Sequence, residues 1–352
     1  MKKLFILITM VMFSVWIAKA STNEIIVQPR IPLAGHFINP PTKLSIIGNP
    51  IYSLRSTLIQ NIWSGNGFPM AGANVVSNNV PTPYLNGPMP TNLLHSDSYT
   101  FVLKDNSGTP IWTNLVYSFV PTNSGTRLVI YHAGHDGYIP IYYTQPDYQE
   151  IPGYNSGDLV RKLVENGYTV VSIAMPFLQQ GHSGYLPTPN GTINHLRFFV
   201  EPTIRIINQF TNATKVFMTG ISGGGWTTTL VAALDTRITV SAPTAGSLPF
   251  YIVPQPRDWE QFLPGLPVTC DYTNLYVMAA DRPGRVQTQF LNSNDGCCFS
   301  GVDALANIDY TVNTIARASS YGGTWSRYIT INWNHSFDID VQTNIVNLFN
   351  AH

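Results

Sequence analysis

Charged residues are scarce in this chain of 352 residues. Only 11% of its residues are Asp, Glu, Lys or Arg, and 19 basic residues balance 19 acidic ones. The chain therefore lacks the large positive surface with which proteins bind nucleic acids or anionic membranes. We expect no nucleic-acid partner. The sequence also lacks internal repeats and low-complexity linkers, so the alternation of its elements carries the information on fold.

Long apolar runs are also absent, with one exception at the N-terminus. Residues 4–18 are apolar, follow two lysines, and precede a small-x-small motif at 18–20. This order is typical of a secretory signal peptide with cleavage after Ala20. A membrane-spanning helix needs about 20 apolar residues, which no other run approaches. We expect residues 1–20 to be removed, which leaves a secreted or periplasmic protein of net charge about −3 without a membrane span.

Cysteines are few, with three in the whole chain. In an oxidising compartment three cysteines predict one disulfide and one remaining thiol. Adjacent cysteines pair with each other only under strain. We therefore expect a bridge from Cys270 to either Cys297 or Cys298. The alternative is three buried free thiols, because cysteine is often a small core residue.

Glycines are concentrated around one serine. Residues 216–226 read Val-Phe-Met-Thr-Gly-Ile-Ser-Gly-Gly-Gly-Trp, which places Ser222 at the centre of a Gly-x-Ser-x-Gly motif. A strand-like segment precedes the motif, and apolar residues recur at helical spacing after it. Strand, glycine turn and helix together present a serine hydroxyl as a nucleophile. A phosphate-binding loop would need a lysine at the start of the helix, where residues 225–227 supply none.

Strand and helix patterns alternate along most of the chain. Residues 21–97 are rich in Pro, Asn and Gly, and we expect them to form an extension packed on the main domain. The segment 247–270 interrupts the later pattern with prolines and aromatics, as expected of a cap. The remaining alternation predicts an α/β protein whose mostly parallel sheet has helices on both faces. The expected elements are strands 99–104, 114–120 and 127–131, helix 157–166, strand 168–174, helix 196–210, strand 215–219, the helix after Ser222, strand 238–242, helix 271–280, strand 286–291, helix 302–318, strand 327–332, and a final helix from 337 capped by Ser336.

This order of elements, including the Gly-x-Ser-x-Gly turn, resembles the α/β-hydrolase fold over residues 98–352. The resemblance implies a catalytic triad in the chain order serine, acid, histidine. Ser222 is then the nucleophile. His335 lies just beyond the expected last strand, where this fold carries its general base.

Two aspartates compete for the role of the triad acid. Asp295 lies in the loop after the expected strand 286–291, whereas Asp281 follows a segment with the pattern of a capped helix. We favour Asp295 and keep Asp281 as the alternative. In either case the carboxylate would orient the histidine and stabilise its protonated form.

The resemblance also implies an oxyanion hole made of two backbone N–H groups. Gly223 follows the nucleophile, and either Gly134 or His135 is expected to supply the second N–H from a His-Gly loop at 132–137. The same loop holds residue types that bind zinc. We expect no metal in this loop, because the histidines do not lie on a helix and no Cys/His pair at ligand spacing follows.

These residues predict an exported serine hydrolase that cleaves carboxylic esters through an acyl-enzyme, without a cofactor. Its expected partner is a small-molecule or polymer-borne ester. Two alternatives stay open: a serine peptidase of the same fold, and a non-catalytic ligand-binding protein on a hydrolase scaffold. The motifs determine the mechanism better than the substrate.

Overall fold

The chain divides into two compact units, residues 1–45 and residues 46–352. The elements described below belong to the second unit, and the expected signal peptide lies outside the described residues. Among the described helices, none combines the length and apolarity that crossing a membrane requires. The computed structural model describes residues 51–83, 88–135, 154–176, 193–252, 259–262, 266 and 270–352.

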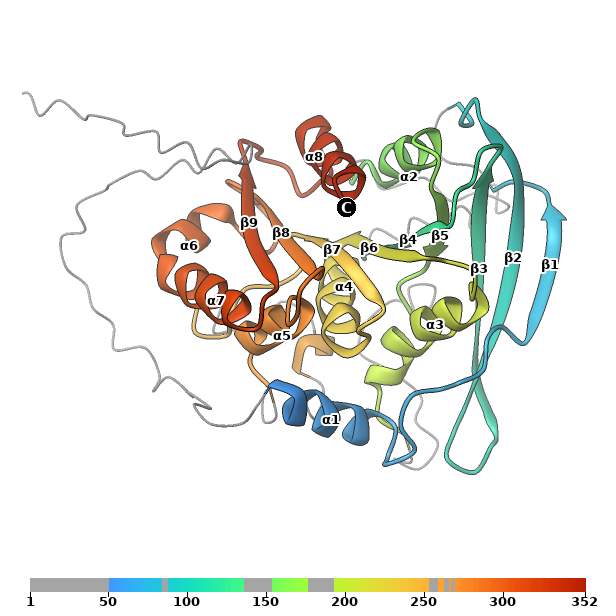
Figure 1. The fold of residues 1–352 in the computed structure, drawn as a ribbon, viewed down its shortest axis with the longest axis horizontal. Coiled ribbons are helices and arrows are strands. Elements are labelled where there is room, and N and C mark those ends of the chain that lie inside the picture. The colour runs from blue at the N-terminus through green and yellow to red at the C-terminus, as the bar shows by residue number, and fades with distance from the viewer. Residues whose placement is uncertain are drawn as a thin grey trace, which may run out of the picture. The chain divides into compact units, whose positions relative to one another are not determined.

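A sheet of nine strands forms the centre of this unit (Figure 1). The order across the sheet is β1-β2-β3-β5-β4-β6-β7-β8-β9. Neighbours from β1 to β5 are antiparallel, and neighbours from β5 to β9 are parallel. The expected, mostly parallel sheet is thus confirmed. The strands are β1 (Val75–Val80), β2 (Leu93–Lys104), β3 (Pro110–Pro121), β4 (Arg127–His132), β5 (Thr169–Ile173), β6 (Lys215–Ile221), β7 (Ile238–Thr244), β8 (Val286–Asn292) and β9 (Thr324–Thr330).

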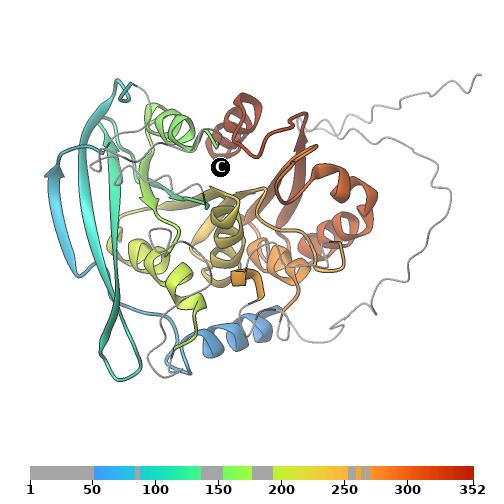
Figure 2. The ribbon, with the colours of Figure 1, turned by 180° about the vertical axis from the view of Figure 1, so that it is seen from behind.

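Helices cover both faces of the sheet (Figures 1 and 2). Helices α2 and α8 lie on one face, and α3, α4, α5 and α7 lie on the other. Helix α1 packs outside α4 and α5, so the described part of the expected extension contributes this helix and the edge strand β1. The helices are α1 (Ile51–Ile62), α2 (Ser156–Glu165), α3 (Leu196–Gln209), α4 (Gly223–Leu234), the short η3 (Trp259–Phe262), α5 (Tyr272–Ala279), α6 (Gly301–Ala306), α7 (Ile308–Ser320) and α8 (Ile339–Asn350).

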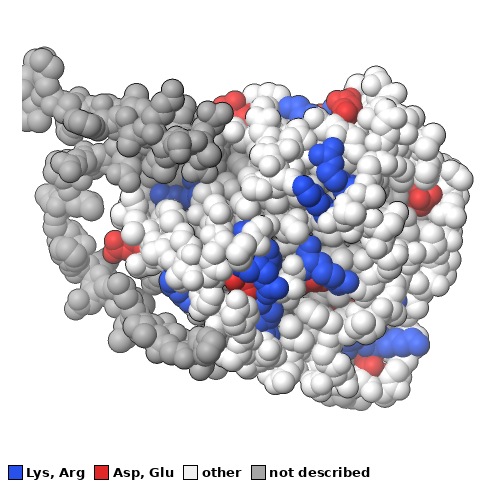
Figure 3. Space-filling view, in the orientation of Figure 1, with Lys and Arg blue, Asp and Glu red and all other residues white. Residues whose placement is uncertain are grey.

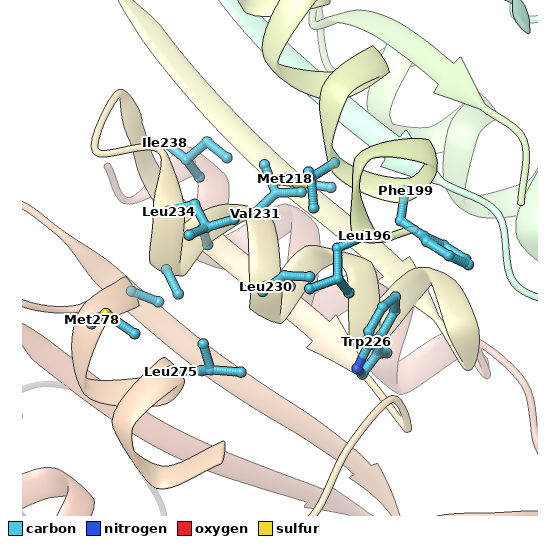
Figure 4. Close-up of a cluster of buried hydrophobic side chains, with 14 of the residues drawn as sticks. Leu196, Phe199, Met218, Trp226, Leu230, Val231, Leu234, Ile238, Leu275 and Met278 are labelled. Atoms are coloured by element: carbon cyan, nitrogen blue, oxygen red, sulfur yellow. The ribbon is translucent and has the colours of Figure 1, made fainter. Parts of the chain in front are cut away.

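Helix α4, which follows the glycine-serine turn, is buried along its whole length. Its apolar side chains pack against β6, α3 and α5 (Figure 4). The Trp226 indole N–H donates to the Tyr272 hydroxyl at 2.8 Å, so its one polar group is satisfied within the core. Burying each large apolar side chain contributes about 1.5–3 kcal/mol, so this helix holds its own N-terminus firmly against the sheet.

Charged side chains are few and scattered on the face seen in Figure 3, with no large region of one sign. This distribution agrees with the low charge content of the sequence. Many of the remaining charges are paired inside the molecule instead of on its surface.

The C-terminal boundaries differ from those expected. Strand β9 ends at Thr330, and the segment expected to form one helix at 302–318 is divided into α6 and α7. The expected cap of the last helix is wrong. Asp338, not Ser336, accepts a hydrogen bond from the Val341 N–H at 2.7 Å, so α8 begins after Asp338. Aspartate is among the strongest N-cap residues, and its use here leaves a loop that carries His335.

A buried cluster of charges surrounds Asp281, which has no exposed surface. Its carboxylate lies 2.7 Å from Arg285, 2.8 Å from Arg55 and 3.2 Å from Arg282. Burial alone raises the pKa of Asp281, but hydrogen bonds and charges of these arginines outweigh it and lower the pKa to about 2. The carboxylate therefore joins α1 to the connection between α5 and β8.

Arg55 also supports the ends of two other helices. Its guanidinium donates to the Ala233 carbonyl at 2.7 Å and to the Met278 carbonyl at 2.7 Å. These carbonyls lie in the last turns of α4 and α5, where no partner within the helix is available. A cation at that position also complements the helix dipole. Arg55 thus joins helix α1 to the rest of this unit, in addition to the buried apolar side chains of the helix.

Replacing Asp281 with Asn should lower the free energy of unfolding by about 3–5 kcal/mol, because buried guanidinium groups lose their carboxylate. Chemical denaturation at neutral pH measures this loss. The folded-state pKa lies below the ordinary value of 3.8, so the carboxylate stabilises the fold above that pH and loses this effect as pH falls through about 2.

The difference between wild type and Asp281→Asn should therefore shrink between about pH 4 and pH 2. The exposed Asp303 offers a matched control, for which we expect a loss under about 1 kcal/mol. Equal losses for the two variants would contradict the role of the cluster.

Candidate active site

Ser222 occupies the turn between β6 and α4 with an unusual backbone conformation. Its φ is 58° and its ψ is −127°, a region that residues other than glycine rarely adopt. The Ser222 N–H donates to the Thr244 carbonyl at 3.0 Å, and its carbonyl accepts from the Trp226 N–H at 2.9 Å. The neighbouring strand β7 and the following helix α4 therefore both hold the turn in place. This strand-turn-helix geometry is that of a nucleophile elbow.

Two glycines allow the end of β4 to approach this turn. In the sheet register His132 of β4 faces Gly220 of β6. A Cβ at Gly220 would lie 2.5 Å from the His132 carbonyl oxygen, and a Cβ at Gly224 would also collide with that oxygen. Side chains at either position would push the elbow away from β4. Glycine is therefore required at both positions because a side chain would collide with β4, and not only because glycine permits unusual backbone torsion angles.

The loop after β4 lies beside Ser222. A Cβ at Gly134 would come within 2.9 Å of the Ser222 Cβ, and one at Gly223 within 2.9 Å of His135 Cε1. The structure thus brings Gly134, His135 and Gly223, the expected oxyanion residues, around Ser222. The choice between Gly134 and His135 as second donor stays open.

Two further residues, Met175 and Glu260, cover this corner of the site, and sequence analysis did not identify Glu260. Met175 lies against Gly223, 2.6 Å from where a Cβ would stand. Glu260 of η3 is fully buried and has a carboxylate oxygen 3.0 Å from His135 Nε2. A buried acidic residue in an irregular segment has no recognisable sequence pattern. This contact links the described part of the expected cap at 247–270 to the loop after β4.

His132 is neutral at physiological pH. Its side chain is buried, and desolvation lowers its pKa to about 4, against the raising effect of its hydrogen bond to the Ala133 carbonyl. That bond joins Nδ1 to the carbonyl oxygen at 2.9 Å. His132 and His135 therefore face different partners. Asp136, the carboxylate residue of the same 132–137 loop, lies outside the described residues.

Asp295 and His335 form a close pair. The distance between Asp295 Oδ2 and His335 Nδ1 is 2.6 Å. The other carboxylate oxygen accepts from the backbone N–H groups of Cys297 at 2.9 Å and Cys298 at 3.1 Å. Burial alone raises the pKa of Asp295, but the histidine and these N–H groups lower it overall. An ionised Asp295 holds the proton of His335 on Nδ1, which leaves Nε2 as the basic nitrogen.

The turn around His335 is held by a buried asparagine at the end of β8. Asn292 Nδ2 donates to the Asn334 carbonyl at 2.8 Å and to the Ser336 carbonyl at 3.2 Å, on both sides of the histidine. The ring of Tyr154 packs edge-on against the imidazole, with centroids 4.9 Å apart. Sequence analysis did not single out Asn292, because a polar residue at a strand end has no distinguishing pattern.

Ser222, Asp295 and His335 follow β6, β8 and β9, so all three lie at the carboxyl-end edge of the parallel strands. Within the described residues, no hydrogen bond joins the Ser222 hydroxyl to His335, whose Nε2 is buried without a hydrogen-bond partner. Contacts between nucleophile and base are often loose without substrate and tighten when it binds. Asp281, in contrast, precedes β8 at the opposite edge, among its arginines.

The expected disulfide from Cys270 is wrong. Cys297 and Cys298 are joined to each other, with Sγ atoms 2.02 Å apart. Cys270 is a buried free thiol in the core, and burial raises its pKa. The tight turn after Asp295 turns adjacent side chains toward each other, a local geometry that residue spacing does not reveal.

No protein-family model and no curated protein matches the sequence. Among solved structures, the chain is similar to a methylesterase, with a TM-score of 0.54, 17% identity and coverage of 86% of this chain. The chain spans 63% of that protein's length. A glucuronoyl esterase from Teredinibacter turnerae has a TM-score of 0.53 and 11% identity, covering 85% of this chain and 83% of its own.

A glucuronoyl esterase from Solibacter usitatus gives a TM-score of 0.51 at 11% identity, covering 87% of this chain and 92% of its own. At such identities the likeness concerns the fold alone. Together with the sheet order and the elbow, it shows that the chain has the α/β-hydrolase fold.

Replacing Gly134 with Ala should lower the free energy of unfolding by about 1–3 kcal/mol, because the new methyl group overpacks the elbow. It would stand 2.9 Å from the Ser222 Cβ and 2.5 Å from the Ile221 carbonyl oxygen. Urea denaturation measures the loss. Gly125 is the matched control, because a Cβ there meets no atom within 4 Å. A Gly134 variant as stable as the Gly125 variant would contradict this packing.

Proposed function

We propose that this α/β-hydrolase-fold protein is a serine hydrolase that cleaves carboxylic esters. The observation that carries the proposal is the backbone of Ser222, whose positive φ at the end of β6 is maintained by bonds to β7 and α4. Strain of this kind persists where surrounding structure enforces it, often at reactive residues. The similar solved structures named as a methylesterase and glucuronoyl esterases favour an ester over a peptide substrate.

In this mechanism His335 Nε2 removes the proton of the Ser222 hydroxyl, and the serine oxygen attacks the ester carbonyl. Asp295 keeps the other ring proton on Nδ1 and stabilises the imidazolium that forms. The N–H of Gly223 and a second N–H from Gly134 or His135 would stabilise the negative oxygen of the tetrahedral intermediate. His335 then protonates the departing alcohol. In the second half of the reaction His335 removes a proton from water, the water oxygen attacks the acyl-enzyme, and the acid leaves as the proton returns to Ser222.

Asp295 is the acid of this proposal because it contacts the histidine at 2.6 Å. The alternative, Asp281, has its carboxylate engaged by three arginines. We also propose that residues 1–20 direct export and are cleaved after Ala20, which N-terminal sequencing of the mature protein tests. A peptidase of the same fold and a non-catalytic binding protein remain alternatives that a panel of ester and peptide substrates separates.

A fluorophosphonate probe should label the purified mature protein at Ser222 and leave Ser222→Ala unlabelled, because only an activated serine reacts. His335→Ala should react far more slowly. Asp295→Asn should lose kcat on the order of 10⁴-fold on an activated ester, since its histidine takes the wrong tautomer. Folded Asp281→Asn should be labelled like wild type. The proposal would be refuted if the probe labelled Ser222→Ala, or if it failed to label a folded wild-type protein.

Replacing Asn292 with Ala should lower kcat/KM about 10- to 100-fold, because the turn carrying His335 loses both bonds that position it. The effect should fall on kcat more than on KM, as expected of a residue that acts through the base. Asn294 in the same loop is a matched control, since among the described residues its side-chain amide donates only to Ser293 Oγ, at 3.5 Å. Comparable kinetics for the two variants would contradict the positioning role.

A further inference from the structure

The disulfide lies next to the proposed base. The sulfur atoms of Cys297 and Cys298 and a ring nitrogen of His335 all lie within 4.8 Å of one another. Cys297 is exposed and Cys298 is partly buried, so solvent reaches the sulfur pair. The hydrolytic mechanism uses neither sulfur. Three groups that ligate metals therefore meet at the edge of the proposed site.

The chemistry of this group depends on the oxidation state of its sulfurs. As a disulfide, neither sulfur is a thiolate, and thiolates are the form that binds metals. Reduction adds two electrons, breaks the S–S bond and gives each sulfur a proton. A phosphine supplies these electrons and takes up the oxygen of one water molecule. When a cation binds, the two thiols release these protons to solvent, and two thiolates and one imidazole form a Cys₂His ligand set, which suits zinc and leaves a fourth position open.

His335 is already arranged as a metal ligand would be. Histidines that bind metals commonly donate their other ring N–H to a carboxylate, which fixes the tautomer and raises the basicity of the ligating nitrogen. His335 Nδ1 has this relation to Asp295 at 2.6 Å. Its Nε2 is buried without a hydrogen-bond partner among the described residues. The tautomer that prepares His335 as a base is therefore the one that prepares it to bind a metal.

We propose that Cys297, Cys298 and His335 form a redox-gated site for Zn²⁺ or a similar thiophilic divalent cation. With the disulfide closed, the site binds no metal and His335 is available as a base. With the disulfide reduced, the cation binds both thiolates and Nε2, and it occupies the lone pair that proton removal from Ser222 needs. The binding itself stands on these three residues, whereas its inhibitory consequence rests on the proposed hydrolase function.

The test compares oxidised and phosphine-reduced full-length mature protein with Co²⁺ as a spectroscopic probe and Zn²⁺ as the inhibitor. We expect thiolate-to-cobalt charge-transfer absorption, and about one Zn²⁺ per chain in equilibrium dialysis, only after reduction. Fluorophosphonate labelling of the reduced protein should slow at least tenfold with Zn²⁺ and recover with a chelator. Labelling of the oxidised protein should not respond to Zn²⁺.

Variants identify the ligands. Reduced Cys297→Ser/Cys298→Ser should lose the charge-transfer band, and reduced His335→Ala should bind Zn²⁺ at least tenfold more weakly. Cys270→Ala is the matched control, because it removes a buried thiol outside the group and should bind as wild type does. Equal zinc binding by oxidised and reduced protein, or an unchanged band in the double variant, would overturn the proposal.

The cobalt spectrum does not depend on catalysis, so the two proposals can fail separately. A reduced protein with the expected band but no probe labelling in its oxidised form would refute the hydrolase and not the metal site. If the probe labels the protein normally, Zn²⁺ does not change the labelling rate in either redox state, and no cobalt band forms, the metal site is refuted and the hydrolase is not.

Discussion

The close approach of β4 to the turn after β6 is the constraint on which the site depends. The His132 carbonyl oxygen lies where side chains at Gly220 or Gly224 would otherwise stand. This contact keeps the turn that carries Ser222 close to β4, and the loop that follows β4, with Gly134, lies over the same corner. The buried helix α4 then prevents the turn from relaxing, because moving it would disturb the core on three sides.

Periodicity and chain order predicted the features that are local or common to the fold. The glycine turn and the alternation of strands and helices follow from patterns along the chain, and the resemblance to the α/β-hydrolase fold implied the pairing of Asp295 with His335. Residues that act across the fold were not predictable in this way. Asn292 and Glu260 matter only because distant segments fold against them. The start of α8 was misplaced because two residues near its N-terminus could each cap a helix.

Opposite ends of the sheet give two buried aspartates different chemistry. Asp281 meets fixed guanidinium groups, so its charge is neutralised permanently and it stabilises the fold. Asp295 meets an imidazole, whose charge changes with a proton, and backbone N–H groups that favour its own ionised form. Local backbone geometry also decides which cysteines pair. The adjacent Cys297 and Cys298 were not expected to bond to each other, yet the turn that supports Asp295 brings their sulfur atoms together.

The guanidinium of Arg55 reaches three parts of the hydrolase unit from a helix that precedes the whole sheet in sequence. A fragment beginning at the first paired strands would leave carbonyls of α4 and α5 and the carboxylate of Asp281 without this cation. The folding unit therefore begins before the first strand of the sheet. Any domain exchange or fusion designed around this fold would have to carry the helix along with the sheet to inherit its stability.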